Sequence, residues 1–256
     1  MNVLSATAHR PYPLPKRPWR MTLRWNDLLF AHWPVAPQTI APLIPSGLIL
    51  DTYDNAAWIG VVPFFMDNVR TRTIGARRIA IPTTSAFCEL NLRTYVHSPI
   101  SGLSGVYFFS LDAESALAVL GARTLFHLPY FWANMHRTIA SDETIHYTSK
   151  RLLPPPGVRF DAHYRSLGNP TAADTPGTLE YFLTARYCLF TRYAGRILVG
   201  HIHHLPWILE PAETEIRIDQ LPSAHGITLP QRQPLLHFSR RLDVYIWSLE
   251  PDKPVR

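Results

Sequence analysis

Prolines are spread along almost the whole chain, and this feature constrains its architecture more than any other. There are 24 prolines among 256 residues, from Pro11 to Pro254. A proline inside a helix removes a backbone hydrogen bond and clashes with the preceding turn. Collagen, coiled coils and long helical arrays are therefore excluded.

Composition indicates a compact protein of the cell interior. Hydrophobic residues make up 46% of the chain and charged residues 17%, which is enough apolar side chain to offset the entropy lost on folding. No run of eighteen uncharged apolar residues occurs, and residues 1–10 lack the apolar core of a secretory signal. Cys88 and Cys188 lie in apolar patterns typical of buried free thiols, so no disulfide is expected. We predict a cytoplasmic protein without membrane segments.

The positive charge comes almost entirely from arginine. Only Lys16, Lys150 and Lys253 are lysines among the 25 basic residues, and the net charge is +6. Arginine suits the capture of carboxylate or phosphate groups. Nucleic-acid binding would need these residues on one strip, but the arginines at 70–78 fall in a polar stretch expected to be a solvated loop. No nucleic-acid partner is predicted.

Residues 86–96 form the most informative predicted strand. Alternation divides it into an apolar face with Cys88, Leu90, Leu92 and Val96 and a polar face with Glu89, Asn91, Arg93 and Tyr95. Two interpretations are open. The polar face lies in water, or it lines a barrel or cleft where its side chains converge on a ligand.

The remaining patterns predict an α+β fold. We expect a single domain over residues 1–256 with an extended proline-rich arm at 1–20 and a largely antiparallel, partly closed sheet with a few helices. Helical or turn segments are expected at 25–32, 37–43, 113–126 and 211–218, and a long loop at 67–84. Strands are expected at 56–65, 86–96, 105–111, 130–136, 144–152, 158–164, 178–191, 196–204 and 235–249. Asp112 is expected to cap helix 113–126, and Glu180 and Arg186 to share one face of strand 178–191.

Two alternating histidines suggest a metal site. On a strand, His201 and His203 point the same way, as the first two ligands of a metal ion would. No third ligand follows at a suggestive spacing, and the chain lacks a His-Glu-x-x-His helix. We therefore predict a hydrogen-bonded histidine cluster and no cofactor, with metal binding through His201 and His203 as the weaker alternative.

Several segments resemble the YqjF-like family, which is grouped with the acetoacetate-decarboxylase-like superfamily. The resemblance runs from about Trp19 to Trp247. It is carried by residues 25–33 (WNDLLFAHW), 58–64 (WIGVVPF), 89–96 (ELNLRTYV), 105–113 (GVYFFSLDA) and shorter matches at 122–123, 128–130, 177–180, 186–187 and 203–207. It implies a cone-shaped, largely antiparallel barrel with a central cavity.

The same resemblance implies which residues line that cavity. In the decarboxylase a strand glutamate faces the cavity, and Glu89 stands in a similar strand. The decarboxylase lysine that forms a Schiff base follows an arginine and a proline. Arg123 and Pro129 keep that spacing, but Tyr130 occupies the lysine position. Imine-type decarboxylation is therefore not expected.

These inferences predict an enzyme without a Schiff-base lysine, lyase-like or isomerase-like, that acts on a small carbonyl or carboxylate compound. Glu89, Tyr130 and Arg93 are the predicted catalytic residues. The predicted substrate-binding residues are Asn91, Arg123, Glu180 and Arg186. The alternative is a non-catalytic protein that binds a small metabolite, with Glu89 in a structural ion pair. Homo-oligomerisation is left open.

Overall fold

Fourteen strands make up one sheet in the computed structural model, which describes residues 3–73, 75–153 and 156–254. The strands are β1 (Met21–Val35), β2 (Ile49–Leu50), β3 (Ala57–Arg72), β4 (Arg78–Ile79), β5 (Phe87–His97), β6 (Ser104–Ala113), β7 (Tyr130–Ile139), β8 (Ile145–Arg151), β9 (Arg159–Ser166), β10 (Thr171–Ala172), β11 (Cys188–Tyr193), β12 (Arg196–His203), β13 (Ile208–Asp219) and β14 (Leu235–Pro251). The helices are α1 (Pro37–Ile40), α2 (Ala116–Leu125), α3 (Leu179–Thr184) and α4 (Leu221–Ala224), with 3-10 turns η1 (Val3–Ser5) and η2 (Ala41–Leu43).

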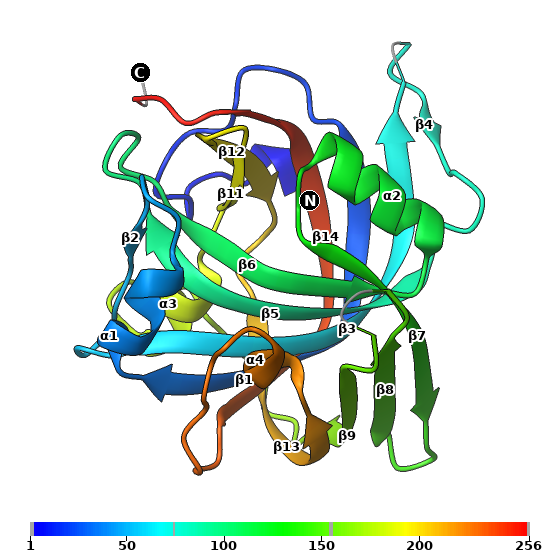
Figure 1. Cartoon of the computed structure of the whole chain (residues 1–256). Helices are drawn as coiled ribbons and strands as arrows, with labels where there is room; N and C mark the ends of the chain where they lie inside the picture. The colour runs from blue at the N-terminus through cyan, green and yellow to red at the C-terminus, as the bar shows by residue number, and fades with distance from the viewer. Residues whose placement is uncertain (1–2, 74, 154–155, 255–256) are drawn as a thin grey trace.

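The sheet closes on itself. It runs in the order β10-β13-β9-β8-β7-β6-β11-β12-β14-β1-β3-β5-β2, and a further pairing of β5 with β6 joins seven of these strands into a ring. Pairing of β13 with β14 attaches the layer β7-β8-β9-β13 at its other edge (Figure 1). Only the β6–β7 and β6–β11 pairs are parallel among the described strands. The predicted largely antiparallel, partly closed sheet with few helices is confirmed.

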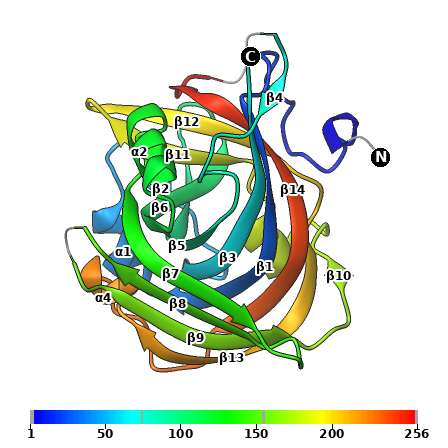
Figure 2. The same cartoon turned by 90° about the vertical axis from the view of Figure 1, so that its right-hand side faces the viewer.

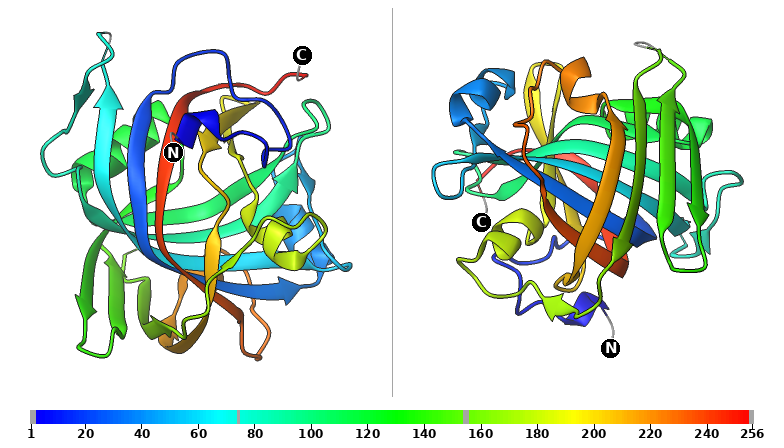
Figure 3. Two further views of the ribbon diagram at one scale, coloured as in Figure 1. Left: turned by 180° about the vertical axis from the view of Figure 1, so that it is seen from behind. Right: turned by 90° about the horizontal axis from the view of Figure 1, so that it is seen from below.

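Two apolar clusters fill the space on the two sides of β5. One lies between β1, β3 and β5 and the layer β7-β8-β9, and it includes Leu90, Leu92 and Tyr147. The other lies on the opposite face and includes Phe30 and Phe64. Figure 2 shows β7, β8, β9 and β13 side by side as a layer against the longer strands, and Figure 3 shows the same layer from behind and from below. Strand β5 is therefore covered on both faces.

The prediction of a helix or turn at 25–32 is wrong, since this segment is the middle of β1. Its register with β3 shifts between Asn26 and Ala31, and Asp27 has a positive φ of 49°. The irregularity leaves Leu28, Leu29 and Phe30 all buried in succession. A continuous apolar run of this kind does not distinguish a buried strand from a helix.

Two further element predictions are wrong in the second half of the chain. Residues 211–218 belong to β13, where exposed and half-buried side chains alternate as they do on a strand with one face in water. Residues 178–191 form α3 and then β11, and the Thr178 side chain caps α3 by accepting a hydrogen bond from the Tyr181 amide. Glu180 and Arg186 therefore do not share a strand face.

Asp112 does not cap a helix. It lies in β6 with no exposed surface, and its carboxylate accepts hydrogen bonds of 2.7 and 3.1 Å from the buried Arg151 guanidinium. The cap of α2 is Ser115, whose hydroxyl accepts from the Ala118 amide at 3.2 Å. The predicted loop 67–84 is partly a hairpin, because β3 continues to Arg72 and pairs with β4.

The arm packs on the outer side of β12. The Arg10 guanidinium is 8% exposed and donates a hydrogen bond of 2.9 Å to the Ile202 carbonyl. Residues 1 and 2 of the predicted arm lie outside the described residues. In the part of the chain that the structure describes, no helix is both long and apolar enough to cross a bilayer. The single domain over 1–256 stays a prediction.

Candidate active site

Glu89 is a buried carboxyl in the middle of β5. It is 3% exposed, and Asn91, two residues on, is 5% exposed. Its cross-strand neighbours are Phe64 on β3 and Ala113 on β6, both members of the second apolar cluster. The polar face of β5 is therefore enclosed by protein rather than solvated.

Tyr130 reaches this carboxyl from the first position of β7. Its hydroxyl donates a hydrogen bond of 2.8 Å to Glu89 Oε2. The chain enters β7 through a tight connection after α2, in which His127 has a φ of 47° and its carbonyl accepts from the Thr191 hydroxyl. Parallel pairing of Tyr130 with Leu111 of β6 then fixes the ring beside β5.

Burial governs the titration of this pair. It raises the pKa of Glu89 to about 8, and hydrogen bonds from Tyr130 and Asn91 oppose the increase. Burial also raises the pKa of Tyr130 well above its usual value, and the neighbouring Glu89 carboxylate adds to the effect. A carboxyl that titrates near neutrality next to a phenol can accept and return a proton.

A second polar group continues along the same face of β5. Register places Arg93 opposite Gly60, and Gly60 opposite His32 of β1, so these side chains lie in one row. The Tyr95 hydroxyl lies 2.7 Å from His32 Nε2 and accepts a hydrogen bond of 3.4 Å from Arg93. The Arg93 guanidinium also lies 5.1 Å from the centre of the Phe30 ring. Burial lowers the pKa of His32 well below its usual value.

Three polar atoms on this face are buried without a hydrogen-bond partner among the described residues. They are Asn91 Oδ1, Arg93 Nε and His32 Nδ1. Buried polar atoms in folded proteins are almost always paired. The unpaired acceptor and donor atoms therefore mark the stretch of this face from Asn91 to Arg93 and His32, which continues from Glu89, as suited to a polar ligand. Sequence reasoning missed His32, because the misassigned helix at 25–32 hid its place on a strand.

The other predicted binding residues lie apart from Glu89. Arg123 is exposed on α2, and its one hydrogen bond to the described residues is donated to the Tyr130 carbonyl, at 3.4 Å. Glu180 lies on α3, 3.9 Å from His237. Arg186 is paired with Asp51 at 2.5 Å, and its guanidinium packs 5.0 Å from the Tyr95 ring centre. Arg186 thus packs against Tyr95, the hydrogen-bond partner of His32 and Arg93. Arg123 and Glu180 lie outside the site.

No lysine lies on the enclosed face. Lys16, Lys150 and Lys253 are all exposed. Lys150 sits on β8, opposite Asn134 and Arg159.

The two alternating histidines of β12 engage other partners. His203 Nδ1 accepts a hydrogen bond of 3.1 Å from the Arg10 guanidinium, and its Nε2 donates one of 2.8 Å to the Val3 carbonyl. His201 Nε2 lies 3.3 Å from Glu250. Among the described residues, no third ligand group gathers around this pair. A metal site here stays a prediction.

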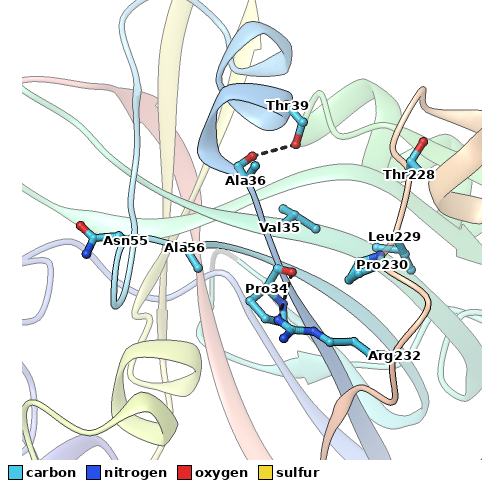
Figure 4. Close-up of a pocket in the computed structure, with 10 residues that line it drawn as sticks. All are labelled: Pro34, Val35, Ala36, Thr39, Asn55, Ala56, Thr228, Leu229, Pro230 and Arg232. Carbon is cyan, nitrogen blue, oxygen red and sulfur yellow. Dashed lines mark hydrogen bonds between the residues drawn. The ribbon is translucent and has the colours of Figure 1, made fainter.

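Two hollows open elsewhere on the surface. One of about 460 Å³ lies between the end of β1 and the segment before β14, where Arg232 donates to the Pro34 carbonyl (Figure 4). The other, of about 700 Å³, lies under the proline-rich arm beside His201. Neither is lined by Glu89 or Tyr130. The predicted cavity beside Tyr130 stays a prediction.

Comparison with solved structures shows which proteins share this fold. Acetoacetate decarboxylase from Legionella pneumophila shares the fold, with a TM-score of 0.58, 12% identity, and coverage of 97% of this chain and 95% of that one. The enduracididine biosynthesis enzyme MppR, complexed with pyruvate, gives a TM-score of 0.60 at 13% identity, covering 94% and 92%. The predicted acetoacetate-decarboxylase-like fold is confirmed.

A much nearer relative is known from sequence. "Uncharacterized protein YqjF" of Bacillus subtilis (strain 168) is 47% identical over 236 residues, which cover 92% of this chain and 94% of that protein. The sequence profile of DUF2071, described as an uncharacterized conserved protein, matches residues 22–243. The resemblance to YqjF-like proteins is thereby confirmed, and the chain belongs to the DUF2071 family.

Proposed function

We propose that this protein is a small-molecule enzyme that moves a proton next to the carbonyl group of a carboxylate compound, with Glu89 and Tyr130 as the acid–base pair. The hydrogen bond of 2.8 Å between them carries the proposal, since it joins a buried carboxyl with a pKa of about 8 to a buried phenol. Such a carboxyl is more basic than an exposed one and keeps a useful ionised fraction near neutral pH.

Arg93 and Asn91 support a carboxylate-bearing substrate. Within the described chain Arg93 donates to the Tyr95 hydroxyl but has no acidic partner, so its charge is free to meet a ligand anion. Along β5 the α carbons of Glu89 and Arg93 lie roughly 13 Å apart, because they are four residues apart on a strand. This spacing favours an oxo acid longer than pyruvate, held by Arg93 at one end and by Asn91 between.

The position of the lysines supports chemistry without an imine. All three are exposed and away from Glu89, and a Schiff base needs an amine within reach of the carbonyl. MppR binds pyruvate in its structure, and acetoacetate decarboxylase acts on an oxo acid by name. We extend the class of substrate from these relatives to this chain, but not the imine.

The proposed step transfers one proton. The Glu89 carboxylate takes a proton from the carbon next to the carbonyl, and the electron pair of that C–H bond forms the enolate. Tyr130 then donates its hydrogen bond to the enolate oxygen in place of Glu89. Delivery of the proton to a different carbon or to the opposite face gives an isomerase-like outcome. Expulsion of a leaving group from the neighbouring carbon by the enolate electron pair, with the Glu89 proton passing to that group, gives a lyase-like outcome. Exclusion of water strengthens each of these contacts.

Deuterium exchange tests this step without knowledge of the natural substrate. The protein is incubated in D2O with pyruvate, acetoacetate or 2-oxoglutarate, and loss of the C–H signal next to the carbonyl is followed by NMR. We expect exchange of at least one of these acids above the buffer rate, which rises with pH through about 8 as Glu89 ionises. Glu89→Gln abolishes exchange, and Tyr130→Phe reduces it at least tenfold.

Controls separate the proposal from its alternative. Asp174→Asn changes an exposed carboxyl shortly after β10 and should leave exchange unaltered. Borohydride with the same acids should leave no adduct, and a stoichiometric adduct on Lys150 would overturn the argument against an imine. If an oxo acid raises the melting temperature in wild type but not in Arg93→Met, and no exchange occurs, the protein is instead a non-catalytic binder of small metabolites.

A further inference from the structure

The outer surface of the β8–β9 pair gathers two histidines and an aspartate. His146 of β8 stands directly opposite His163 of β9. Asp161 lies two residues before His163, so its side chain projects from the same face of the sheet. The inward residues Tyr147, Ala162 and their neighbours are buried, which leaves these three side chains on the solvent side.

Their ligand atoms are close enough for one ion. One nitrogen or oxygen atom from each of the three residues lies within 4.8 Å of the other two, and no other group of this kind occurs among the described residues. His146 Nε2 is 3.1 Å from Asp161 Oδ1. A tetrahedral ion with bonds of about 2.0–2.1 Å holds its ligand atoms about 3.3 Å apart. The nitrogen–oxygen pair is therefore already spaced like two ligands of one ion, which would replace the proton shared between them.

His163, the third candidate ligand, lies beside His146. The rings of His146 and His163 are stacked, with centres 4.1 Å apart and planes 5° apart. His163 Nδ1 is buried and has no hydrogen-bond partner in the described chain. A polar atom without a partner calls for an ion or a water molecule. Both rings are only half-buried, so a small rotation can bring their nitrogens onto a common ion.

Two arginines close to the cluster are already paired with glutamates. Arg165 is paired with Glu213 at 2.5 Å, and Arg217 with Glu215 at 3.1 Å. Both of these guanidinium groups are thus neutralised by a glutamate of β13. Lys150 and Arg159 lie opposite each other two positions along the same face, and no ion pair neutralises them among the described residues. Within the described residues, the only ion-pair partner of Asp161 is His146. The carboxylate charge therefore remains to attract an ion.

We propose that His146, Asp161 and His163 bind a divalent transition-metal ion, of which Zn²⁺ is the expected occupant. Imidazole nitrogens and a carboxylate form a ligand set that suits Zn²⁺ better than Mg²⁺ or Ca²⁺. Three protein ligands leave a coordination position open to water. The site lies on the outer face of the β7-β8-β9-β13 layer and does not depend on Glu89 or Tyr130.

Titration of the metal-free full chain with Zn²⁺ tests the site. The protein is stripped with a chelator, and stoichiometry and affinity are measured by calorimetry at pH 7.5. We expect the double variant His146→Ala, His163→Ala to bind one equivalent fewer than wild type. Asp161→Asn, which keeps the size of the side chain, should weaken that equivalent at least tenfold. His97→Ala removes a strand histidine outside the cluster and should change nothing.

A stability measurement gives a second, independent readout. Zn²⁺ binds the folded chain at this site, so it should raise the melting temperature of wild type and of His97→Ala more than that of the double variant. The double variant should itself fold, since the replaced rings face solvent. Equal stoichiometry in wild type and double variant, or no uptake by wild type at micromolar Zn²⁺, overturns the proposal. Activity with an oxo acid plays no part in either readout.

Discussion

The hydroxyl of Tyr130 donates a hydrogen bond of 2.8 Å to Oε2 of Glu89 and so joins the start of β7 to the middle of β5. Burial raises the pKa of Glu89 to about 8, and it raises that of Tyr130 well above its usual value. Near neutral pH most of the Glu89 carboxyls are therefore protonated. Above pH 8 the Glu89 carboxylate places one negative charge in an apolar setting, which lowers the stability of the fold. The same carboxylate can act as a base.

This pair predicts a loss of stability as the pH rises. The folded chain holds the Glu89 proton up to about pH 8, whereas the unfolded chain releases it near 4.5. Its stabilising contribution is complete below 4.5 and is lost as the pH rises through 8, at about 1.4 kcal/mol for each pH unit between the two values. We expect a difference on the order of 4 kcal/mol between pH 4.5 and 9 in the free energy of urea unfolding.

Comparison with Glu89→Gln isolates this contribution. The amide cannot titrate, so the free energy of unfolding of the variant should change less over the same pH range. The difference between wild type and variant cancels other titrating groups, such as Asp219, whose pKa burial raises to about 7. Parallel pH profiles of the two proteins would mean that Glu89 is ionised in the fold throughout.

The strand that carries this pair was predictable from sequence, and its surroundings were not. Alternation over residues 86–96 placed Glu89, Asn91 and Arg93 on one face, and the structure encloses the first two. Whether that face meets water or protein depends on strands far along the chain, above all β1 and β14. Alternation alone contains no information about those partners.

Each difference between prediction and structure has its own physical cause. In β1 a register shift near Asn26 interrupts the alternation, so the sequence pattern predicts a helix in place of the strand and does not place His32 in the site. In α3 the capping hydroxyl of Thr178 starts a short helix where the β-branched and aromatic residues favour a strand. The cluster of His146 with Asp161 and His163 needs the β8–β9 register, which no spacing along the chain shows.

The buried ion pair of Asp112 and Arg151 predicts a strong dependence of each residue on the other. Both side chains have no exposed surface, and the guanidinium also lies 3.8 Å from the centre of the Phe131 ring. Asp112→Asn leaves a buried cation without a countercharge, which should cost about 3–5 kcal/mol. The double variant Asp112→Leu, Arg151→Met should cost much less than the sum of the single changes in urea unfolding.

Lowering the pH should reduce the destabilisation caused by Arg151→Met but not that caused by Asp112→Asn. Burial raises the pKa of Asp112, and Arg151 opposes that increase. In Arg151→Met the carboxyl can take up a proton and become neutral, so its destabilisation should shrink at pH 5. In Asp112→Asn the guanidinium stays charged, and the loss should persist. Additive single costs with no pH difference would contradict a coupled pair.

In helix α2, replacing the buried residue and replacing an exposed neighbour should have different effects on the free energy of unfolding. Val119 is its one buried residue, while Leu117 and Leu120 are 54% and 60% exposed. Val119→Ala removes the equivalent of two buried CH2 groups and should cost about 1.6 kcal/mol in urea unfolding. Leu117→Ala should lie within about 0.5 kcal/mol of wild type. Equal losses would show that the leucine side of this helix is covered in solution.

Alanine substitution of Gly105 tests how closely β6 and β11 pack, and Gly121 in α2 provides the control. Gly105 of β6 lies beside Cys188, and a Cβ at that position would stand 2.6 Å from the Cys188 carbonyl oxygen and 2.7 Å from its Sγ. The backbone of β11 at Cys188 is paired with β12 and cannot move away from the added methyl group. Gly105→Ala should therefore destabilise the fold by about 1–3 kcal/mol. In α2, a Cβ at Gly121 would meet nothing within 4 Å. Gly121→Ala should therefore stabilise by about 0.5–1 kcal/mol, because alanine loses less backbone entropy in a helix.

The same urea transitions distinguish packing from a general effect of adding a methyl group. Parallel pairing of β6 with β11 spans only Leu189 and Phe190, so the ring is closed there by few hydrogen bonds and by this close contact. If Gly105→Ala left the midpoint unchanged while Gly121→Ala raised it, the two strands would have to separate at little cost. That result would place the weakest pairing of the ring at β6–β11, next to the connection that positions Tyr130.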